Sequence, residues 1–219
     1  SGFLMGIDVY IPMWMQGVLG LNAAVGGLVL APLSLVWMVG SFLASKWMTQ
    51  MATNWVLRIG LFIAAVGGAW LWLMPFHSNF LWFFAISTVI GVGLGITMTT
   101  STVSAQNSVP REQLGVATSF NTLVRTIGQT VMVAIFGLLI NGITQSELAA
   151  RNLTDDPDIM NKLVNPQTAK EIEAGLLTPL RGILYDGLHQ VYFVGLLLVV
   201  IAFALTFFVR DKSDRIREY

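Results

Sequence analysis

The sequence contains no cysteine, and only 11% of its 219 residues are charged. The lack of cysteine excludes disulfides, zinc–thiolate sites, iron–sulfur clusters and cysteine catalysis. A soluble globular domain carries about 25% charged residues, so this chain cannot cover a water-facing surface in the usual way. Twelve basic residues balance twelve acidic ones, which leaves no basic excess for a nucleic acid partner. With 55% hydrophobic residues and a mean hydropathy of +0.71, the composition indicates a membrane protein.

Long apolar segments divide the chain into membrane spans. A helix needs about 20 mostly apolar residues to cross a hydrocarbon core of roughly 30 Å. We therefore predict an all-α membrane protein, a bundle of six transmembrane helices, with a long extracellular loop at residues 142–185 and a cytoplasmic tail at 210–219. The predicted helices lie near residues 2–19, 23–45, 55–74, 80–104, 114–141 and 186–209.

The first span starts at the first residue, which is Ser1 rather than methionine. A secretory signal would have a charged start and a small-residue cleavage site, and neither is visible. We expect the chain to be cut inside or just before a helix, as the C-terminal part of a longer protein.

Basic residues gather on one side of the predicted membrane. The short loops on the opposite side hold none, although the long loop has four. The positive-inside rule places the richer side, and the C-terminus with it, in the cytoplasm. We expect a multi-pass protein of the cell membrane, of bacterial plasma-membrane type. The residues on the richer side are Lys46, Arg58, Arg111, Arg210, Lys212, Arg215 and Arg217.

Two ionisable residues, Asp8 and Arg125, fall at bilayer depth, where insertion costs about 2.5–3.5 kcal/mol or more. Their expected depths differ by only about 6 Å at 1.5 Å per residue. On one interpretation Asp8 is a proton carrier that responds to Arg125 and to substrate. On the other, the two form a static ion pair that fixes helix packing, or Asp8 lies higher because the first helix is truncated.

The fifth span carries a broad polar face around Arg125. Polar residues recur every four positions along it, which places them on one side of a helix. Such a face cannot contact lipid, so it lines a wet cavity or packs against polar partners. Threonine hydroxyls can also bond back to their own helix. We expect a cavity-lining helix, whose candidate substrate residues are Thr118, Asn121, Thr122 and Gln129.

Two other spans carry polar residues in the same kind of pattern. Asp8, Pro12 and Gln16 repeat at intervals of four in the first span. Pro12 frees a backbone carbonyl near Asp8, which suits a hinge, although proline is also common in membrane helices without any role. Thr97 and Ser101 in the fourth span form a plausible second wall of the cavity.

Residues 91–95 read Gly-Val-Gly-Leu-Gly and match a phosphate-binding loop only by their letters. Because they lie inside an apolar span, we expect close helix packing there rather than nucleotide binding. No Walker motif and no paired metal ligands occur. We therefore expect no enzyme activity, no metal and no cofactor.

Several short motifs resemble those of the major facilitator superfamily. More closely, the chain resembles the fourteen-helix drug:proton antiporters of the EmrB/QacA type. The Val-Pro and following Gly that open the penultimate helix, and a further Gly inside it, are typical of that family. The residues that carry the resemblance are 107–115 with Gly128, 10–16 with Gly20, 27–32, and 40–46.

This resemblance implies the C-terminal six-helix half of an alternating-access transporter, with its cavity against a missing N-terminal transmembrane half. The first, second, fourth and fifth spans would line the path, and the third and sixth would face lipid. Protons and amphipathic small molecules would be the transported species, and protonation of Asp8, or of a partner in the other half, would weaken drug binding and drive the return step. A facilitator or uptake permease of the same fold, and a non-transporting six-helix scaffold, remain alternatives.

Overall fold

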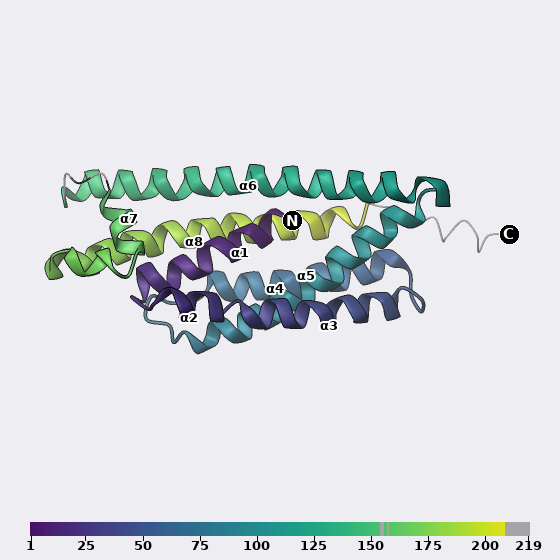
Figure 1. Ribbon diagram of the computed structural model, residues 1–219, viewed down its shortest axis with the longest axis horizontal. Coiled ribbons are helices and arrows are strands. Elements are labelled where there is room, and N and C mark those ends of the chain that lie inside the picture. The colour runs from purple at the N-terminus through teal and green to yellow at the C-terminus, as the bar shows by residue number, and fades with distance from the viewer. Residues whose placement is uncertain (154–155, 157, 209–219) are drawn as a thin grey trace.

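The computed structural model describes residues 1–153, 156 and 158–208, and the predicted tail at 210–219 lies outside this part. Within the described residues the regular structure is entirely helical (Figure 1). The elements are α1 (Gly2–Met13), the π-helix η1 (Trp14–Val18), α2 (Ala23–Leu28), α3 (Ala31–Trp47), α4 (Thr53–Trp72), α5 (Leu81–Asn107), η2 (Arg111–Gln113), α6 (Leu114–Arg151), α7 (Ile159–Val164), η3 (Thr168–Glu171) and α8 (Ala174–Leu205).

The long helices lie side by side in one elongated bundle (Figure 1). α5 packs between α3 and α4, and α8 contacts α4, α6 and α1. Five helical segments in the described chain are long and apolar enough to cross a membrane. The first predicted span forms α1 and η1, of 12 and five residues, which follow each other without a break.

The predicted loop at 142–185 is helical at both ends, because α6 continues to Arg151 and α8 already begins at Ala174. Glu147 and Arg151 form an ion pair one helical turn apart, at 2.8 Å, which supports the last turn of α6. The helix ends where Asn152 adopts a left-handed conformation (φ 47°). Hydropathy shows where a helix leaves lipid, and a helix can continue into water beyond that point.

Glycines let α5 approach its neighbours at backbone contact. A Cβ atom on Gly91 would lie 2.6 Å from the carbonyl oxygen of Leu33, and one on Gly95 would lie 2.4 Å from that of Trp37. On the other side of α5, a Cβ on Gly93 would lie 2.5 Å from the backbone nitrogen of Ala64 in α4. The expectation of close helix packing at residues 91–95 is thus confirmed.

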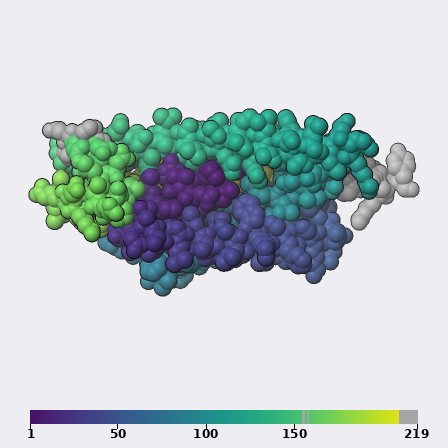
Figure 2. All heavy atoms as spheres, in the orientation of Figure 1, coloured from purple at the N-terminus to yellow at the C-terminus, as the bar shows by residue number. Residues whose placement is uncertain are grey.

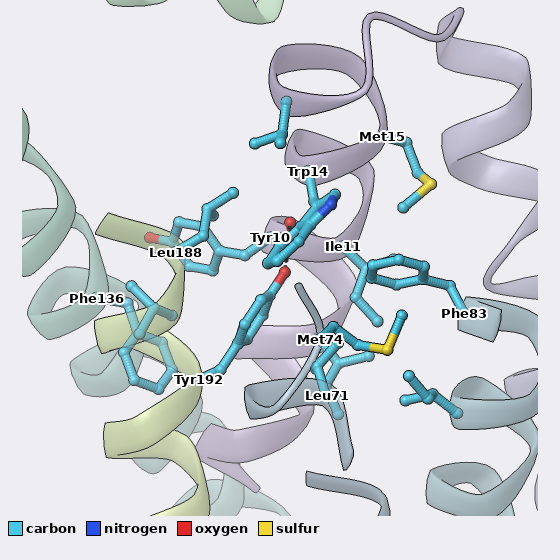
Figure 3. Packing of buried hydrophobic residues seen from close by; sticks show 14 of the residues in the cluster. Tyr10, Ile11, Trp14, Met15, Leu71, Met74, Phe83, Phe136, Leu188 and Tyr192 are labelled. Atoms are coloured by element: carbon cyan, nitrogen blue, oxygen red, sulfur yellow. Dashed lines mark hydrogen bonds between the residues drawn. The ribbon is translucent and has the colours of Figure 1, made fainter. Parts of the chain in front are cut away.

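A cluster of buried aromatic rings joins α1 to α6 and α8 (Figure 3). The Tyr192 hydroxyl donates a 2.9 Å hydrogen bond to the carbonyl oxygen of Tyr10. Trp14 is fully buried and stacks on Tyr192, with ring centroids 5.9 Å apart. Pro12 lacks a backbone N–H, so the regular α-helical ladder cannot continue through it, and the π-helix η1 follows directly.

The connection from α6 to α8 folds back over the end of η1. Ile159 and Leu163 of α7 are buried, and α7 contacts both η1 and α8. Beside them Lys162 donates a 2.6 Å hydrogen bond to the Asp156 carboxylate. This bond lowers the pKa of Asp156 and raises the pKa of Lys162 from their ordinary values.

Candidate functional site

A cavity of about 840 Å³ lies between α4, α5, α6 and α8, in the half of the bundle next to η2. Figure 2 shows a hollow beside the purple atoms of α1, at the end of that helix where the chain starts. Ser1 itself lies on the cavity wall. The lining residues are Ser1, Leu57, Leu61, Thr97, Met98, Ser101, Ala105, Val109, Gln113, Val116, Ala117, Phe120, Asn121, Val124, Arg125, Ala202, Leu205 and Thr206.

Four of the predicted site residues meet in this cavity. Thr97 and Ser101 lie on α5, and Asn121 and Arg125 lie on α6. The Asn121 amide donates a long hydrogen bond of 3.5 Å to the carbonyl oxygen of Ser101, which joins the two helices. The Thr97 hydroxyl bonds back to the carbonyl oxygen of Gly93 at 2.7 Å. The polar residues predicted on the fourth and fifth spans therefore line the same cavity.

Arg125 is the charged side chain of the cavity. It is half-buried, and its Nε atom is buried without a hydrogen-bond partner within the described part of the chain. Much of the surrounding wall is apolar, with Leu57, Leu61 and Phe120 on it. A guanidinium carries five N–H donors and no acceptor. Such a group in an apolar cavity favours a ligand or water that offers acceptor oxygens.

Asp8 lies away from this cavity. Ser1 lies beside Gly128 of α6, and Gly6 lies against Phe136 farther along the same helix. Asp8 is therefore level with α6 residues beyond Phe136. At a rise of about 1.5 Å per residue, this is about 16 Å or more from Arg125 along the axis of α6. Among the described residues no ion pair joins Asp8 to Arg125. The estimate of matching depths is wrong because α1 starts level with the middle of α6.

The remaining predicted residues do not line the cavity. Pro12 packs against Gly26 of α2, and the Gln16 amide donates to the carbonyl oxygen of Pro12 at 3.3 Å. The Thr118 hydroxyl accepts from Gln106 at 3.0 Å and donates to its own helix. Thr122 is exposed and Gln129 is half-buried, and both lie outside the cavity lining.

Two helices expected to face only lipid contribute to the cavity. α4 supplies Leu57 and Leu61, and α8 supplies Ala202 and Leu205 with Thr206 directly after it, whereas α3 supplies none of the lining. The expected assignment of path-lining helices concerned the interface with an N-terminal half, so it stays a prediction beside this cavity. Lipid tails are as apolar as leucine, so an apolar side chain on a cavity wall and one facing lipid cannot be told apart in the sequence.

Sequence reasoning also missed the role of Arg58, which was taken only as a marker of the cytoplasmic side. Its Nη2 atom donates a 3.1 Å hydrogen bond to the carbonyl oxygen of Thr206, a cavity residue. The guanidinium also lies over the rings of Trp55 and Phe207, at 5.1 and 4.2 Å from their centroids. Arg58 thus ties α4 to the C-terminal end of α8, where a cation is favoured.

Comparison with known proteins finds similarity to bacterial drug-resistance and multidrug transport proteins. The chain is 24% identical to the multidrug transporter protein MdtP of Bacillus subtilis over 95% of this chain and 44% of that protein. It is 22% identical to multidrug resistance protein 3 of the same organism, over 97% of this chain and 43% of that protein. The tetracycline resistance determinant of Streptomyces rimosus is also 22% identical, over 97% of this chain and 70% of that protein.

The chain spans less than half the length of the two Bacillus subtilis relatives. A family model described as the Major Facilitator Superfamily matches residues 1–133. This match covers more than half of the 219 residues and includes α1 to α5 and the first half of α6. The chain therefore belongs to the Major Facilitator Superfamily.

Proposed function

We propose that this chain is the C-terminal transmembrane part of a proton-coupled drug efflux transporter of the fourteen-helix antiporter type. It would work by alternating access together with an N-terminal half. The names of its relatives, which include two multidrug proteins and a tetracycline resistance determinant, support export of drug-like molecules. The share of these relatives that the chain covers is consistent with one part of a larger transporter.

The observation that carries the proposal is the cavity shared by α5 and α6. Its volume of about 840 Å³ lies within the range of about 300–1,000 Å³ that small-molecule sites occupy. Apolar walls suit the body of an amphipathic molecule, and Asn121 and Arg125 provide polar groups that fix its orientation. Because Arg125 is positively charged, the site favours the acceptor oxygens of a neutral or zwitterionic substrate at this edge.

Asp8 is the proton carrier in this proposal, acting at a distance from the cavity. It is half-buried on α1, next to Val9, which is exposed. A carboxyl group at bilayer depth is favoured in its neutral form, so binding and release of a proton change the charge of this surface. We propose that this surface meets the N-terminal half, and that the charge change biases the packing of the two halves against each other.

Cysteine labelling at Ser101 tests whether substrate occupies the cavity. The chain has no cysteine, so Ser101→Cys in the whole protein, with any other cysteine replaced, introduces one thiol at the cavity wall. We expect a maleimide to label this thiol in membranes, and we expect tetracycline to slow the labelling. Ser45→Cys on the exposed part of α3 is the control, where labelling should not respond to tetracycline.

Two results would contradict the proposal. If Ser101→Cys is labelled at the same rate with and without tetracycline, the substrate does not bind against this wall. If Ser101→Cys is not labelled at all while Ser45→Cys is, protein rather than water or substrate fills the cavity in the whole transporter.

A further inference from the structure

His189 lies in a cage of aromatic rings at the α7 end of the bundle, far from the α5–α6 cavity. Its imidazole is half-buried, with its centroid 4.1 Å from the ring of Tyr185 and 5.3 Å from that of Trp14. The Nδ1 atom is 3.2 Å from the carbonyl oxygen of Tyr185. Since a carbonyl oxygen only accepts, Nδ1 carries the hydrogen in this contact and Nε2 is left to bind a proton.

The cage joins three elements of the fold. Trp14 is the first residue of η1 and is fully buried, and its Nε1 atom has no hydrogen-bond partner among the described residues. Tyr185 of α8 donates through its hydroxyl to the carbonyl oxygen of Met74, just after α4, at 3.2 Å. Figure 3 shows Trp14 next to the ring of Tyr192, on which it stacks. The position of η1 therefore depends on ring packing in this cage.

We propose that His189 is a proton-binding site that controls the contact between η1 and α8. With a neutral imidazole the ring packs against Trp14 and Tyr185, and η1 is held on α8. When the imidazole binds a proton, the cage loses stability, and η1 moves more freely relative to α8.

The groups around His189 decide the direction of this effect. Tyr10 on α1 and Tyr185 and Tyr192 on α8 are neutral near pH 7, and the other histidine, His77, is separated from the cage by Phe76. Asp186 on α8 is the nearby carboxylate, and its side chain is exposed. No ion pair with His189 occurs in the described ranges.

Burial disfavours an imidazolium that has no buried anion beside it. The indole face of Trp14 and the carbonyl oxygens of Tyr185, Met74 and Trp72 beside the imidazole offset only part of this cost of burying the charge. Histidine is the side chain whose ordinary pKa places its charge change between about pH 5 and 8. The contact between η1 and α8 is therefore complete at neutral pH and weakens as the pH falls.

This site would add a second proton-responsive group to the proposed coupling, on the opposite half of the bundle from Arg125. Its link to transport rests on the proposed function, whereas the pH-dependent contact can be measured in a protein that transports nothing.

Hydrogen exchange tests the inference in the whole protein reconstituted in lipid. After correction for the intrinsic pH dependence of exchange, we expect the backbone amides of residues 14–21 to exchange at least about fivefold faster at pH 5.5 than at pH 7.5, a population shift of about 1 kcal/mol. His189→Gln removes the titrating group and should abolish the difference. His77→Gln, which changes the other histidine of the chain, should retain it.

Three outcomes would overturn the inference. These are a wild type without a pH effect on exchange at residues 14–21, a His189→Gln protein that retains the effect, and a His77→Gln protein that loses it. His189→Phe guards against loss of packing in the glutamine variant, because it keeps an aromatic ring in the cage. It should give slow exchange of residues 14–21 at both pH values.

Discussion

Arg125→Leu should reduce tetracycline export at least about tenfold, a loss of roughly 1.4 kcal/mol, and should leave the protein folded. The guanidinium provides a positive charge and several donors in a largely apolar cavity, so in the proposed function its loss removes the group that orients the substrate. Folding is expected to lose little, because Arg125 forms no ion pair within the described residues and its Nε atom lacks a partner. Arg125→Lys keeps the charge and should restore part of the export.

The measurement combines drug export from vesicles with the thermal unfolding midpoint of the purified protein. Arg111→Leu is the matched control, because Arg111 is exposed in η2 and does not line the cavity. It should leave both values unchanged. If Arg125→Leu lowers the unfolding midpoint and Arg125→Lys restores it while export is unaffected by either, Arg125 has a structural role. The alternative of a non-transporting membrane scaffold would then be favoured.

Gly95→Ala should destabilise the bundle by about 1–3 kcal/mol, the usual cost of overpacking. The new Cβ atom would lie 2.4 Å from the carbonyl oxygen of Trp37 and 3.1 Å from its Cα. Both atoms belong to the backbone of α3, which cannot move aside as the end of a side chain can. The helices α3 and α5 must therefore separate, and the packing that positions Thr97 and Ser101 changes with them.

Gly137→Ala on α6 is the matched control for this substitution. A Cβ atom at Gly137 would meet no atom within 4 Å. Because alanine is favoured over glycine in a helix by about 0.5–1 kcal/mol, this variant should be neutral or stabilised. The check is the thermal unfolding midpoint in detergent. A Gly95→Ala protein that unfolds at the same temperature as Gly137→Ala would show that α3 and α5 are not in backbone contact.

Hydropathy was sufficient to predict the helical bundle and the approximate place of every long helix. It could not predict where helices end in water, since the last turns of α6 depend on the Glu147–Arg151 pair and on the conformation of Asn152. It also could not reveal η1, because a π-helix reflects the loss of one backbone donor at Pro12 and local packing rather than periodicity.

The candidate site was predictable where spacing on a single helix decides the geometry. Asn121 and Arg125 are one turn apart on α6, so they had to share a face, and both line the cavity. Asp8 and Arg125 lie on different helices, and their relative depth depends on how α1 is placed along α6. Gln16 does not line this cavity, because a polar side chain in a membrane helix can satisfy itself locally, as its bond to the carbonyl oxygen of Pro12 shows.

Tetracycline uptake into everted vesicles under an imposed pH gradient tests whether this transporter couples drug export to protons. Everted membrane vesicles that contain the whole protein would be given tetracycline in the medium, and uptake into the vesicles would be followed by fluorescence. We expect tetracycline to accumulate while the vesicle interior is acidic, and we expect the accumulation to be lost when a protonophore collapses the gradient. No uptake of tetracycline, or uptake at the same rate after the gradient is collapsed, would contradict proton-coupled efflux.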